Sequence, residues 1–331
     1  MKYSIVLPVR NGGHYVKECV DSILRQTLPD LNLVVLDNCS TDGTLAWLQS
    51  LRDERIILHP APQPLSIEAN WARIRTVPRN EFMTMIGHDD LLHPRYLEVM
   101  DQLIHRHPNA TLYQAHYAYI DAEGRFVRDC LPMDEQQYVH EFLACQMGRT
   151  IDSTGTGYMM RSADYDRAGG MPSTYPNLIF ADFALWLQLM TYGYKATAFE
   201  RTFSYRVHNS VSRTTNGMAF LQAFGEYVKE IALLQTGNPL LQQAAERYGH
   251  DFLLFWCESL SHRLLKTPMA DRSLKVDGLI QQFNQYAQQL IPGQAFRPLS
   301  VGRIRLARQL DSFGPTRSLF QWYRRQTGNP S

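Results

Sequence analysis

The sequence predicts an α/β fold in which a mostly parallel sheet, flanked by helices, is followed by an all-helical region. Through the first 110 residues, short apolar runs alternate with segments of helical spacing, which is typical of a parallel sheet. From about residue 217 onward the hydrophobic periodicity is almost purely helical. The chain has 331 residues, 44% of them hydrophobic, which is enough for a large core in one or two domains.

Apolar runs and helical stripes define the elements of the first third. A strand is predicted over residues 4–9, and a helix over residues 15–26 gathers its apolar residues on one face. The other elements of this third are strands over 31–36, 56–59 and 82–86, and helices over 42–51 and 67–76. This alternation predicts a Rossmann-like, nucleotide-binding half over about residues 1–110.

Residues 111–216 are predicted to form the other half of the α/β domain. Two short strands join through a turn within residues 111–127, and a loop rich in Gly, Ser and Thr over 150–161 leads into another strand. Residues 182–192 have helical spacing, and residues 196–207 are strand-like.

The rest of the chain, residues 217–331, is predicted to be a helical domain. Its expected helices cover residues 218–235, 239–248, 251–265, 273–291, 301–313 and 316–325. We place the end of the α/β domain, residues 1–216, at the point where the periodicity changes.

Charge and cysteine content narrow the class of protein. A net charge of +1 argues against a nucleic-acid binder, although the tail from residue 297 onward carries seven arginines and one acidic residue. Five scattered cysteines without a C-x-x-C pair fit a reduced, cytoplasmic protein. No apolar run approaches the roughly 20 residues of a membrane span. The Arg-rich tail is expected either to lie on the anionic inner face of the cell membrane or to pack on its own domain.

Acidic residues follow two of the predicted strands. Asp37 ends the run Leu33–Leu36, and Gly87-His88-Asp89-Asp90 follows the run Phe82–Ile86. Ligands of open α/β sheets bind beyond the carboxyl ends of the strands, and a hard cation such as Mg²⁺ prefers oxygen ligands from carboxylates, phosphates and water. These strand ends predict a site for a phosphate-bearing nucleotide that is held through a metal ion.

Each candidate near the strand ends also has a structural interpretation. The loop Pro8–Asn11 could place Arg10 against a phosphate or could simply start the next helix. Asp37 could accept a hydrogen bond from a ribose hydroxyl or a base imino group, or could serve the turn that follows. Asp89 and Asp90 are costly neighbours without a cation, but Asp90 could instead cap the next turn.

Two further candidates lie later in the chain. Asp182, at the start of a predicted helix, could be a general base, although N-terminal capping is the simpler interpretation for an isolated aspartate. His208 follows a predicted strand and could contact a metal ion or a phosphate, although a lone histidine is more often structural.

Seven stretches together resemble the family 2 glycosyltransferases, which are inverting enzymes with a GT-A fold. In chain order they are SIVLPVRN (4–11), SILRQT (22–27), VVLDNCSTDGT (34–44), IGHDDLLHP (86–94), TGTGYMMRSADYDRAGGMP (154–172), ADFALWLQL (181–189) and YRVHNSVS (205–212). Each stretch is unspecific alone, but their ordered succession is specific and spans about residues 3–213.

The resemblance assigns roles to particular residues. The donor nucleotide would contact Pro8, Val9, Arg10, Asn11, Asp37, His88, Asp89, Asp90 and Arg206. Asp89 and His208 would contact Mg²⁺ or Mn²⁺, and the loop of Gly155, Thr156 and Gly157 would lie beneath the donor sugar and the acceptor. Asp182 would be the catalytic base, and the half of the α/β domain over about residues 111–216 would bind the acceptor.

Three features depart from the family pattern. Gly87 stands where the first aspartate of the D-x-D motif is usual, and Ala181 stands where an acid often precedes the base. The Q-x-x-R-W signature of processive synthases is absent, which favours single-sugar transfer. The resemblance therefore implies transfer from a nucleotide-diphosphate sugar, with uridine as the expected base, to a hydroxyl of a glycan or a polyprenyl-diphosphate-linked acceptor, as in bacterial surface polysaccharide biosynthesis.

The sequence lacks the motifs of two other classes of nucleotide-binding enzyme. A dinucleotide-binding oxidoreductase needs a Gly-rich fingerprint after the first strand, and Pro8–Gly13 does not supply one. A nucleotidyltransferase would be favoured by a tight Gly-rich phosphate loop early in the chain, and none is present. The remaining alternative is a non-catalytic nucleotide-sugar-binding or scaffold protein whose metal site has decayed, because Gly87 removes one carboxylate.

Overall fold

The computed structural model describes residues 1–208 and 215–313, which divide into two compact units. The α/β unit comprises residues 1–142, 149–174 and 181–208, and the helical unit comprises residues 143–148, 175–180 and 215–313. Two short segments from the first two thirds of the chain thus belong to the helical unit, and no periodicity in the sequence indicates this.

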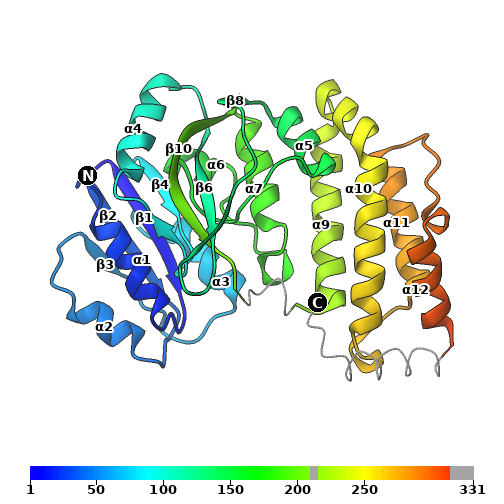
Figure 1. Ribbon diagram of the computed structural model, residues 1–331, viewed down its shortest axis with the longest axis horizontal. Helices are drawn as coiled ribbons and strands as arrows, with labels where there is room; N and C mark the ends of the chain where they lie inside the picture. Colours follow the sequence, from blue (N-terminus) through cyan, green and yellow to red (C-terminus); the bar gives the residue numbers. More distant parts are fainter. Residues whose placement is uncertain (209–214, 314–331) are drawn as a thin grey trace. The chain divides into compact units, whose positions relative to one another are not determined.

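Four parallel strands form the first half of the sheet (Figure 1). They are β1 (Tyr3–Val9), β2 (Leu31–Asp37), β3 (Ile56–Leu58) and β4 (Phe82–Met85), in the order β3-β2-β1-β4. The helices between them are α1 (Tyr15–Leu24), α2 (Thr44–Ser50) and α3 (Ile67–Ala72), the last followed by a 3₁₀ turn over Arg73–Thr76. β1 is buried along its whole length, as expected for a central parallel strand.

The sheet continues as β4-β9-β6-β10-β5 and becomes mixed. Its remaining strands are β5 (Leu91–Leu92), β6 (Leu112–Ile120), β7 (Phe126–Asp129), β8 (Gln136–Gln137), β9 (Tyr158–Arg161) and β10 (Lys195–Arg206). β9 runs antiparallel to both β4 and β6, whereas β6 and β10 are parallel. The predicted α/β sheet with flanking helices is confirmed, and the antiparallel β9 is the main departure from a parallel sheet.

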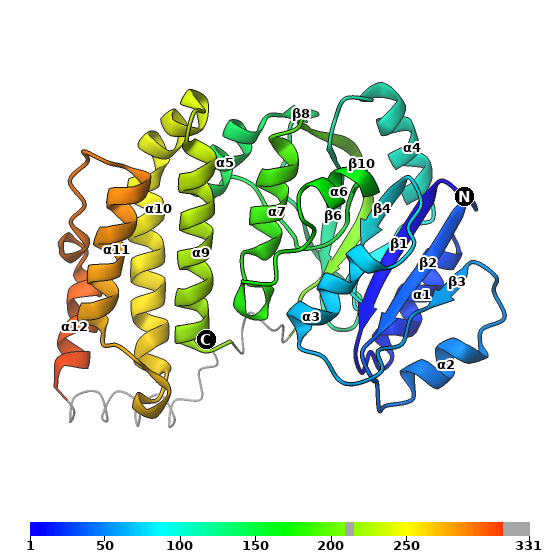
Figure 2. The same ribbon diagram turned by 180° about the vertical axis from the view of Figure 1, so that it is seen from behind.

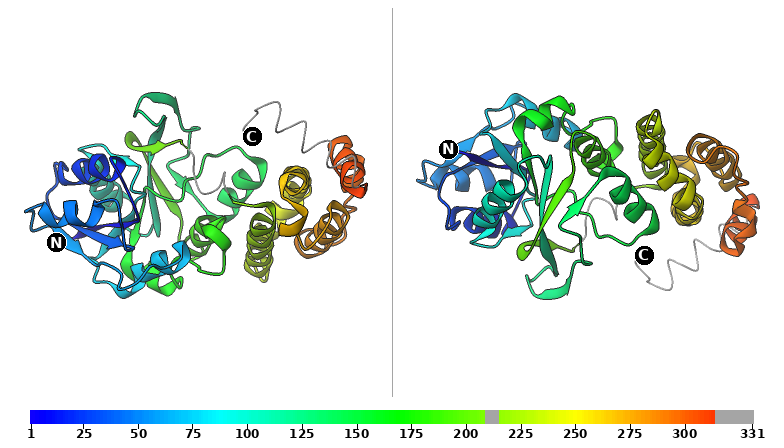
Figure 3. Two further views of the ribbon diagram at one scale, coloured as in Figure 1. Left: turned by 90° about the horizontal axis from the view of Figure 1, so that it is seen from below. Right: turned by 90° about the horizontal axis from the view of Figure 1, so that it is seen from above.

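Helices cover both faces of this sheet, as the end-on views show (Figure 3). The remaining helices of this part of the chain are α4 (Tyr96–Arg106), α5 (Val139–Gly148), α6 (Ser162–Arg167) and α7 (Ala181–Met190). Tyr3, Ile5 and Leu7 of β1 share a core with α1 and α4. The helices α3, α6 and α7 lie on the opposite face (Figure 2). Loops that follow β1, β2 and β4 therefore emerge at one edge, between the two helical layers.

The helical unit consists mainly of α9 (Gly217–Gln235), α10 (Pro239–Lys266), α11 (Val276–Leu290) and α12 (Gly302–Ser312), side by side (Figure 1). Asn216 and Asn238 cap α9 and α10 through side-chain oxygens that accept backbone N–H groups. Aromatic rings fill the core: Phe224 of α9 lies 5.6 Å from both Phe252 and Trp256 of α10 and 5.3 Å from Phe283 of α11.

The prediction of separate helices over residues 239–248 and 251–265 is wrong, because α10 runs through Gly249 without a break. A Cβ at position 249 would lie 2.9 Å from Cγ2 of Ile291, so this glycine serves close packing rather than a turn. The helices α4 and α5 lie outside the predicted elements. The predicted helix over 316–325 lies outside the described residues.

The described part of the Arg-rich tail packs within the helical unit. Ile304 and Ala307 of α12 are fully buried, and α12 contacts α10 and α11. Asp311 forms a buried ion pair with Arg272 at 2.9 Å and accepts a 2.8 Å hydrogen bond from the backbone N–H of Val276. Within residues 1–208 and 215–313, none of the helices combines the length and the hydropathy required to span a bilayer.

Candidate active site

Backbone and side-chain hydrogen bonds connect the loops that follow β1 and β2. The backbone N–H of Asn11 donates to Ser40 Oγ at 2.9 Å, and the Asn11 side chain accepts from the backbone N–H of Thr41 at 2.8 Å. The N–H of Gly13 donates to Asp42 Oδ2 at 2.9 Å. Asn11 has a φ of 53°, a left-handed conformation that asparagine tolerates better than most residues. The two loops therefore form one rigid rim.

Asp37 lies on this rim directly opposite Val9 in the parallel register. Its side chain is buried, with 1% of the residue exposed. Oδ2 accepts a 3.2 Å hydrogen bond from the N–H of Ser40, whereas Oδ1 has no hydrogen-bond partner in the described part of the chain. A buried carboxylate oxygen without a hydrogen bond lowers the stability of the fold. An N–H or O–H group of a ligand could supply the missing hydrogen bond.

The other predicted residues of the rim have narrower roles. Pro8 and Val9 are buried in β1, and the Val9 carbonyl already accepts a 2.9 Å hydrogen bond from Asn38 N–H. They can line a pocket but contribute few polar groups. Arg10 is exposed at the end of the strand, where its guanidinium faces solvent. Of the residues expected to bind the nucleotide here, Arg10 and Asp37 have charged side chains.

Asp89 and His208 come together from the ends of β4 and β10. His208 Nε2 and Asp89 Oδ2 are 2.5 Å apart, and about a quarter of each side chain is exposed (25% and 24%). The His208 ring stacks on Tyr15 of α1, with centroids 5.3 Å apart. Burial lowers the pKa of the neighbouring His88, which interacts electrostatically with both Asp89 and His208. The sequence could not show that α1 supports this pair.

Asp90 points inward, in contrast to its neighbour. The residue is 2% exposed, and its Oδ1 accepts a 3.0 Å hydrogen bond from the backbone N–H of Arg206. Oδ2 accepts a 2.6 Å hydrogen bond from Thr156 Oγ1. Burial and the charge of Asp89 raise the pKa of Asp90 above its usual range. Asp90 therefore connects the loop after residue 153 to β10, and both of its side-chain oxygens are engaged within the protein.

Arg206, which is expected to contact the donor nucleotide, is held by several groups of the protein itself. Its side chain is 1% exposed, and its Nε donates to the Asp89 carbonyl at 2.7 Å. Nη2 pairs with Glu18 Oε2 at 2.6 Å, Nη1 donates to the Ala122 carbonyl at 3.1 Å, and the guanidinium lies 4.7 Å from the Tyr15 ring centroid. The guanidinium is therefore buried and holds the backbone of the Asp89 loop in place.

The space beside Gly87 is occupied by the two carboxylates that follow it. A Cβ at position 87 would lie 2.7 Å from Asp89 Oδ1 and 3.0 Å from Asp90 Oδ2. The glycine thus does more than remove one acid of the D-x-D pattern. It lets the chain turn so that Asp89 meets His208 while Asp90 turns into the core.

Asp182 is partly buried in the first turn of α7. Burial raises its pKa to about 6, although the backbone N–H groups of Phe183 and of Asp182 itself act in the opposite direction. The loop that carries Gly155 passes close to it, because a Cβ on Gly155 would lie 3.4 Å from Asp182 Oδ2. A carboxylate in this setting is a stronger base than an exposed aspartate.

Gly157 is fixed beneath the site. It has a φ of +81°, and a Cβ there would lie 2.6 Å from the Phe203 ring. The Gly157 N–H donates to the Met85 carbonyl at 3.0 Å, and Trp186 Nε1 donates to the Thr154 carbonyl at 3.1 Å. The loop that contains Gly155, Thr156 and Gly157 is therefore held by both the sheet and α7.

Tyr205 connects the two groups of carboxylates and was not singled out by sequence reasoning. Its pKa is raised first by burial and then by the charges of Asp90, Asp89 and Asp182. One phenol thus lies within electrostatic range of all three acids. The sequence signal was its place beside Arg206 in a matched stretch, but an aromatic residue in a strand more often indicates core packing.

Few of the described side chains at this site could bind a cation. In the part of the chain that the structure describes, no three His, Cys, Asp or Glu side chains are grouped to hold a metal ion. Asp89 and His208 provide two ligands, because both oxygens of Asp90 are engaged elsewhere. Mg²⁺ commonly keeps water and substrate phosphates in its shell, so this pair fits a cation that is bound largely through the substrate.

Sequence comparison identifies the family. The model of glycosyl transferase family 2 matches residues 4–167. The chain is 26% identical over 216 residues to TuaG of Bacillus subtilis, a glycosyltransferase named for teichuronic acid biosynthesis, covering 63% of this chain and 81% of TuaG. It is 28% identical over 126 residues to the glycosyltransferase GlyG of Streptococcus pneumoniae, covering 37% of this chain. The matched stretch spans 42% of GlyG and 19% of a glycosyltransferase of Rickettsia bellii.

Structure comparison agrees with this. TarS of S. aureus, solved with UDP-GlcNAc, superposes with a TM-score of 0.67 at 15% identity and covers 99% of this chain and 92% of the TarS chain. The mannosyltransferase PcManGT of Pyrobaculum calidifontis, solved with GDP-Man and Mn²⁺, gives a TM-score of 0.50 at 16% identity, covering 97% of this chain and 87% of that one. At these identities the likeness establishes the fold. The chain belongs to glycosyl transferase family 2 and has the GT-A fold.

Proposed function

We propose that this chain transfers a single sugar from a nucleotide-diphosphate sugar to an acceptor hydroxyl, with inversion at the anomeric carbon. The observation that carries the proposal is the setting of Asp182. Its pKa is raised to about 6, it lies beside the loop at Gly155, and it shares the surroundings of Tyr205 with Asp89. Such a carboxylate is ionised at neutral pH and basic enough to take a proton.

The rim after β1 and β2 is proposed to bind the nucleoside. The unsatisfied Oδ1 of Asp37 can accept a hydrogen bond from a base imino group or a ribose hydroxyl. The TarS structure contains UDP-GlcNAc and the PcManGT structure contains GDP-Man, and both bases carry an imino N–H. We propose a UDP sugar as the donor, with Arg10 at the exposed end of the strand near the phosphates.

Asp89 and His208 are proposed to hold Mg²⁺ or Mn²⁺, which when bound supplies positive charge against the departing diphosphate. Two neighbouring residues hold Asp89 and His208 in position. Arg206 fixes the backbone of Asp89, and Tyr15 supports the ring of His208 from one side. Both supports are buried or stacked, so the pair keeps its orientation before a donor arrives.

The transfer itself is proposed to be one displacement. Asp182 takes the proton of an acceptor hydroxyl while that oxygen forms a bond to the anomeric carbon, and the bond from this carbon to the diphosphate oxygen breaks with its electron pair. Attack from the opposite face inverts the configuration. Gly155 leaves space beside the carboxylate, since any side chain there would approach Oδ2.

The acceptor is proposed to be a glycan or a polyprenyl-diphosphate-linked saccharide, as in bacterial surface polysaccharide biosynthesis. The name of TuaG, which refers to teichuronic acid biosynthesis, supports this class. A cytoplasmic location with peripheral contact between the Arg-rich tail and an anionic membrane belongs to the same proposal. Arg303 and Arg308 form ion pairs with Glu258 and Asp277, so membrane contact would compete with these pairs, and co-sedimentation with anionic vesicles tests it.

Asp182→Asn tests the proposed base. The variant should bind the nucleotide sugar with unchanged affinity in calorimetry, because donor contacts are made elsewhere. Its transfer rate should fall by about 10²- to 10⁴-fold, the usual effect of losing a positioned base. Asp251→Asn, at a side chain that is 92% exposed in the helical unit, is the matched control and should keep full activity. Near-normal transfer by Asp182→Asn would contradict the assignment.

The alternative function is a non-catalytic nucleotide-sugar-binding or scaffold protein. It is favoured by the presence of only two candidate cation ligands, Asp89 and His208, in the described part of the site. Slow hydrolysis of the donor in the absence of acceptor separates the two functions. An active site should release the nucleotide diphosphate, and a scaffold should not.

A further inference from the structure

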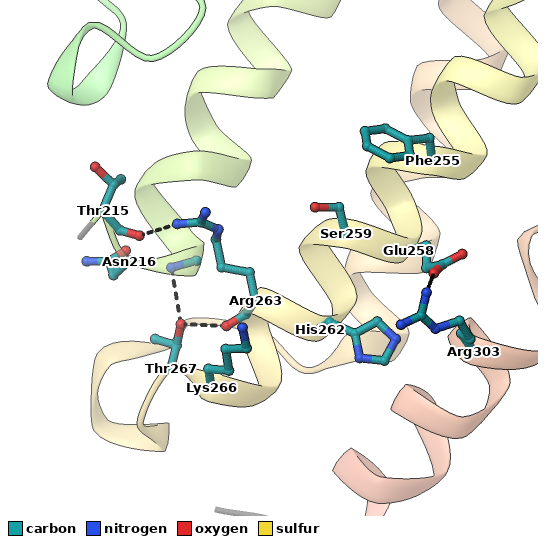
Figure 4. Close-up of a pocket in the computed structure, with 11 residues that line it drawn as sticks. Thr215, Asn216, Phe255, Glu258, Ser259, His262, Arg263, Lys266, Thr267 and Arg303 are labelled. Carbon is teal, nitrogen blue, oxygen red and sulfur yellow. Dashed lines mark hydrogen bonds and ion pairs between the residues drawn. The ribbon is translucent and has the colours of Figure 1, made fainter. Parts of the chain in front are cut away.

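One face of α10 is polar and basic, although the helix as a whole is deeply packed. Phe255, Ser259, His262 and Lys266 follow each other at intervals of three or four residues, which places them along one side of the helix, with Glu258 beside Ser259. This stripe lines a cavity of about 550 Å³ that also includes the start of α9 and Arg303 of α12 (Figure 4). All of its lining residues belong to the helical unit.

Positive charge is concentrated in this cavity. Among the described residues that line it, Arg263, Lys266 and Arg303 are basic and Glu258 alone is acidic, whereas the net charge of the whole chain is +1. Glu258 pairs with Arg303 at 2.8 Å, but the Arg303 side chain is 75% exposed, and exposed ion pairs contribute little. The described residues that line the cavity therefore include more basic than acidic side chains, which favours an anion there.

The Arg263 guanidinium is held in place at the cavity wall. Its Nη1 donates to the Thr215 carbonyl at 2.7 Å (Figure 4). The guanidinium also lies 4.1 Å from the centroid of the Phe220 ring. Burial lowers the pKa of Arg263, but an arginine remains protonated at neutral pH. A fixed cation loses little conformational freedom when an anion binds.

We propose that this cavity binds a saccharide that carries a negative charge, in the form of a phosphate or a carboxylate. The cations recognise the charge, while Ser259 and the exposed edge of Phe255 offer a hydroxyl and an apolar surface to the sugar. The volume lies within the range of roughly 300–1,000 Å³ that is usual for small-ligand sites. Binding does not depend on the proposed catalytic residues, but identifying the ligand as part of the glycan acceptor rests on the proposed function.

Calorimetry on the full-length chain tests this site with three probes: glucose 1-phosphate, glucuronic acid and glucose. We expect one or both charged probes to bind at least about tenfold more tightly than glucose, because one charge-assisted hydrogen bond accounts for roughly that ratio. Preference between the two charged probes distinguishes a phosphate site from a carboxylate site. Equal binding of glucose, or no binding of any probe, would overturn the proposal.

Variants locate the binding. Lys266→Gln should weaken the charged probe on the order of tenfold, and Lys266→Glu should weaken it further. Lys229→Gln, at a 63% exposed lysine of α9 that pairs with Glu226, is the matched control and should bind like the wild type. Asp89→Asn should also retain binding. Unchanged binding by both Lys266 variants, or loss of binding only in Asp89→Asn, would refute the site.

Donor hydrolysis by the same wild-type samples separates this inference from the proposed function. A chain that hydrolyses the nucleotide sugar but binds no charged probe overturns the cavity proposal alone. A chain that binds the probe in a Lys266-dependent manner but hydrolyses no donor supports the cavity and counts against catalysis.

Discussion

The adjacent carboxylates of Asp89 and Asp90 face opposite surroundings. Asp89 is a quarter exposed and meets His208, whereas Asp90 is 2% exposed and accepts hydrogen bonds from Thr156 and from the Arg206 backbone. The sequence shows two neighbouring acids but not this division. Gly87 makes it feasible, because both side chains turn back over the space that a side chain at position 87 would fill.

Gly87→Asp, which restores the usual D-x-D pattern, is expected to harm the protein. The new Cβ would lie 2.7 Å from Asp89 Oδ1, so the variant must displace a carboxylate and adds a third negative charge. We expect a loss of about 1–3 kcal/mol in the free energy of unfolding, measured with urea, and lower activity. A variant of unchanged stability with higher activity would show that the glycine is merely a lost ligand.

The stability of the fold should depend on Asp182 in a pH-dependent manner. The pKa of this residue, about 6, lies above its ordinary value of 3.8, so the folded chain binds the proton more tightly than the unfolded chain. Ionised Asp182 therefore costs stability above about pH 6, and this cost disappears as the pH falls toward 4. Asp182→Asn should raise the melting temperature at pH 7.5 more than at pH 4.

Asp251→Asn is again the control for this measurement and should show no such difference between the two pH values. An Asp182→Asn variant with the same melting temperature as the wild type at pH 7.5 would mean that Asp182 is well solvated. In that case its basicity would have no structural cause.

At the scale of elements, the segment before α7 is unusual. Asn177, Leu178 and Phe180 have φ values of 54°, 57° and 66°, which is a strained conformation for residues with side chains. Phe180 belongs to the helical unit, where its ring centroid lies 4.9 Å from Trp256 and 5.5 Å from Tyr227. Two residues later, in the α/β unit, the chain reaches Asp182, the proposed base.

Phe180→Ala is expected to lower kcat more than it lowers donor affinity, because the strained backbone two residues before Asp182 loses the packed side chain that holds it. The free energy of unfolding should fall by about 3–5 kcal/mol. Phe220→Ala is the matched control: Phe220 is 7% exposed and contacts the same Trp256, but it is far in sequence from α7. An equal loss of kcat in both variants would attribute the effect to general destabilisation.

Elements were predictable from the sequence where their pattern is local. β1, β2 and β4 are continuous apolar runs, and the ordered motifs placed Asp37, Asp89 and Asp182 at strand and helix ends. The continuity of α10 through Gly249 could not be predicted from the sequence, because it depends on close packing against Ile291 at the end of α11. The inward turn of Arg206 depends on Glu18, 188 residues away along the chain, and no local pattern encodes such a contact.

At the scale of the whole molecule, the Arg-rich tail shows why net charge is a weak guide to function. Arg303 and Arg308 of α12 pair with Glu258 and Asp277 on the surface of the helical unit. Asp311, the one acidic residue from position 297 onward, is buried against Arg272. A buried ion pair of this kind stabilises the unit only while both partners are present. Within the described residues, the basic character of the chain is expressed most clearly in the cavity beside α10.

The proposed function depends most on Asp37 binding the nucleoside, and Asp89 binding the diphosphate through a cation, of one nucleotide-sugar donor. A crystal structure of the full chain with a UDP sugar and Mn²⁺ tests this most directly. We predict that Asp37 Oδ1 accepts a hydrogen bond from the base or the ribose, that Mn²⁺ bridges Asp89 and the diphosphate, and that Asp182 faces the anomeric carbon. A donor bound elsewhere, or Asp89 turned away from the cation and the diphosphate, would contradict the account.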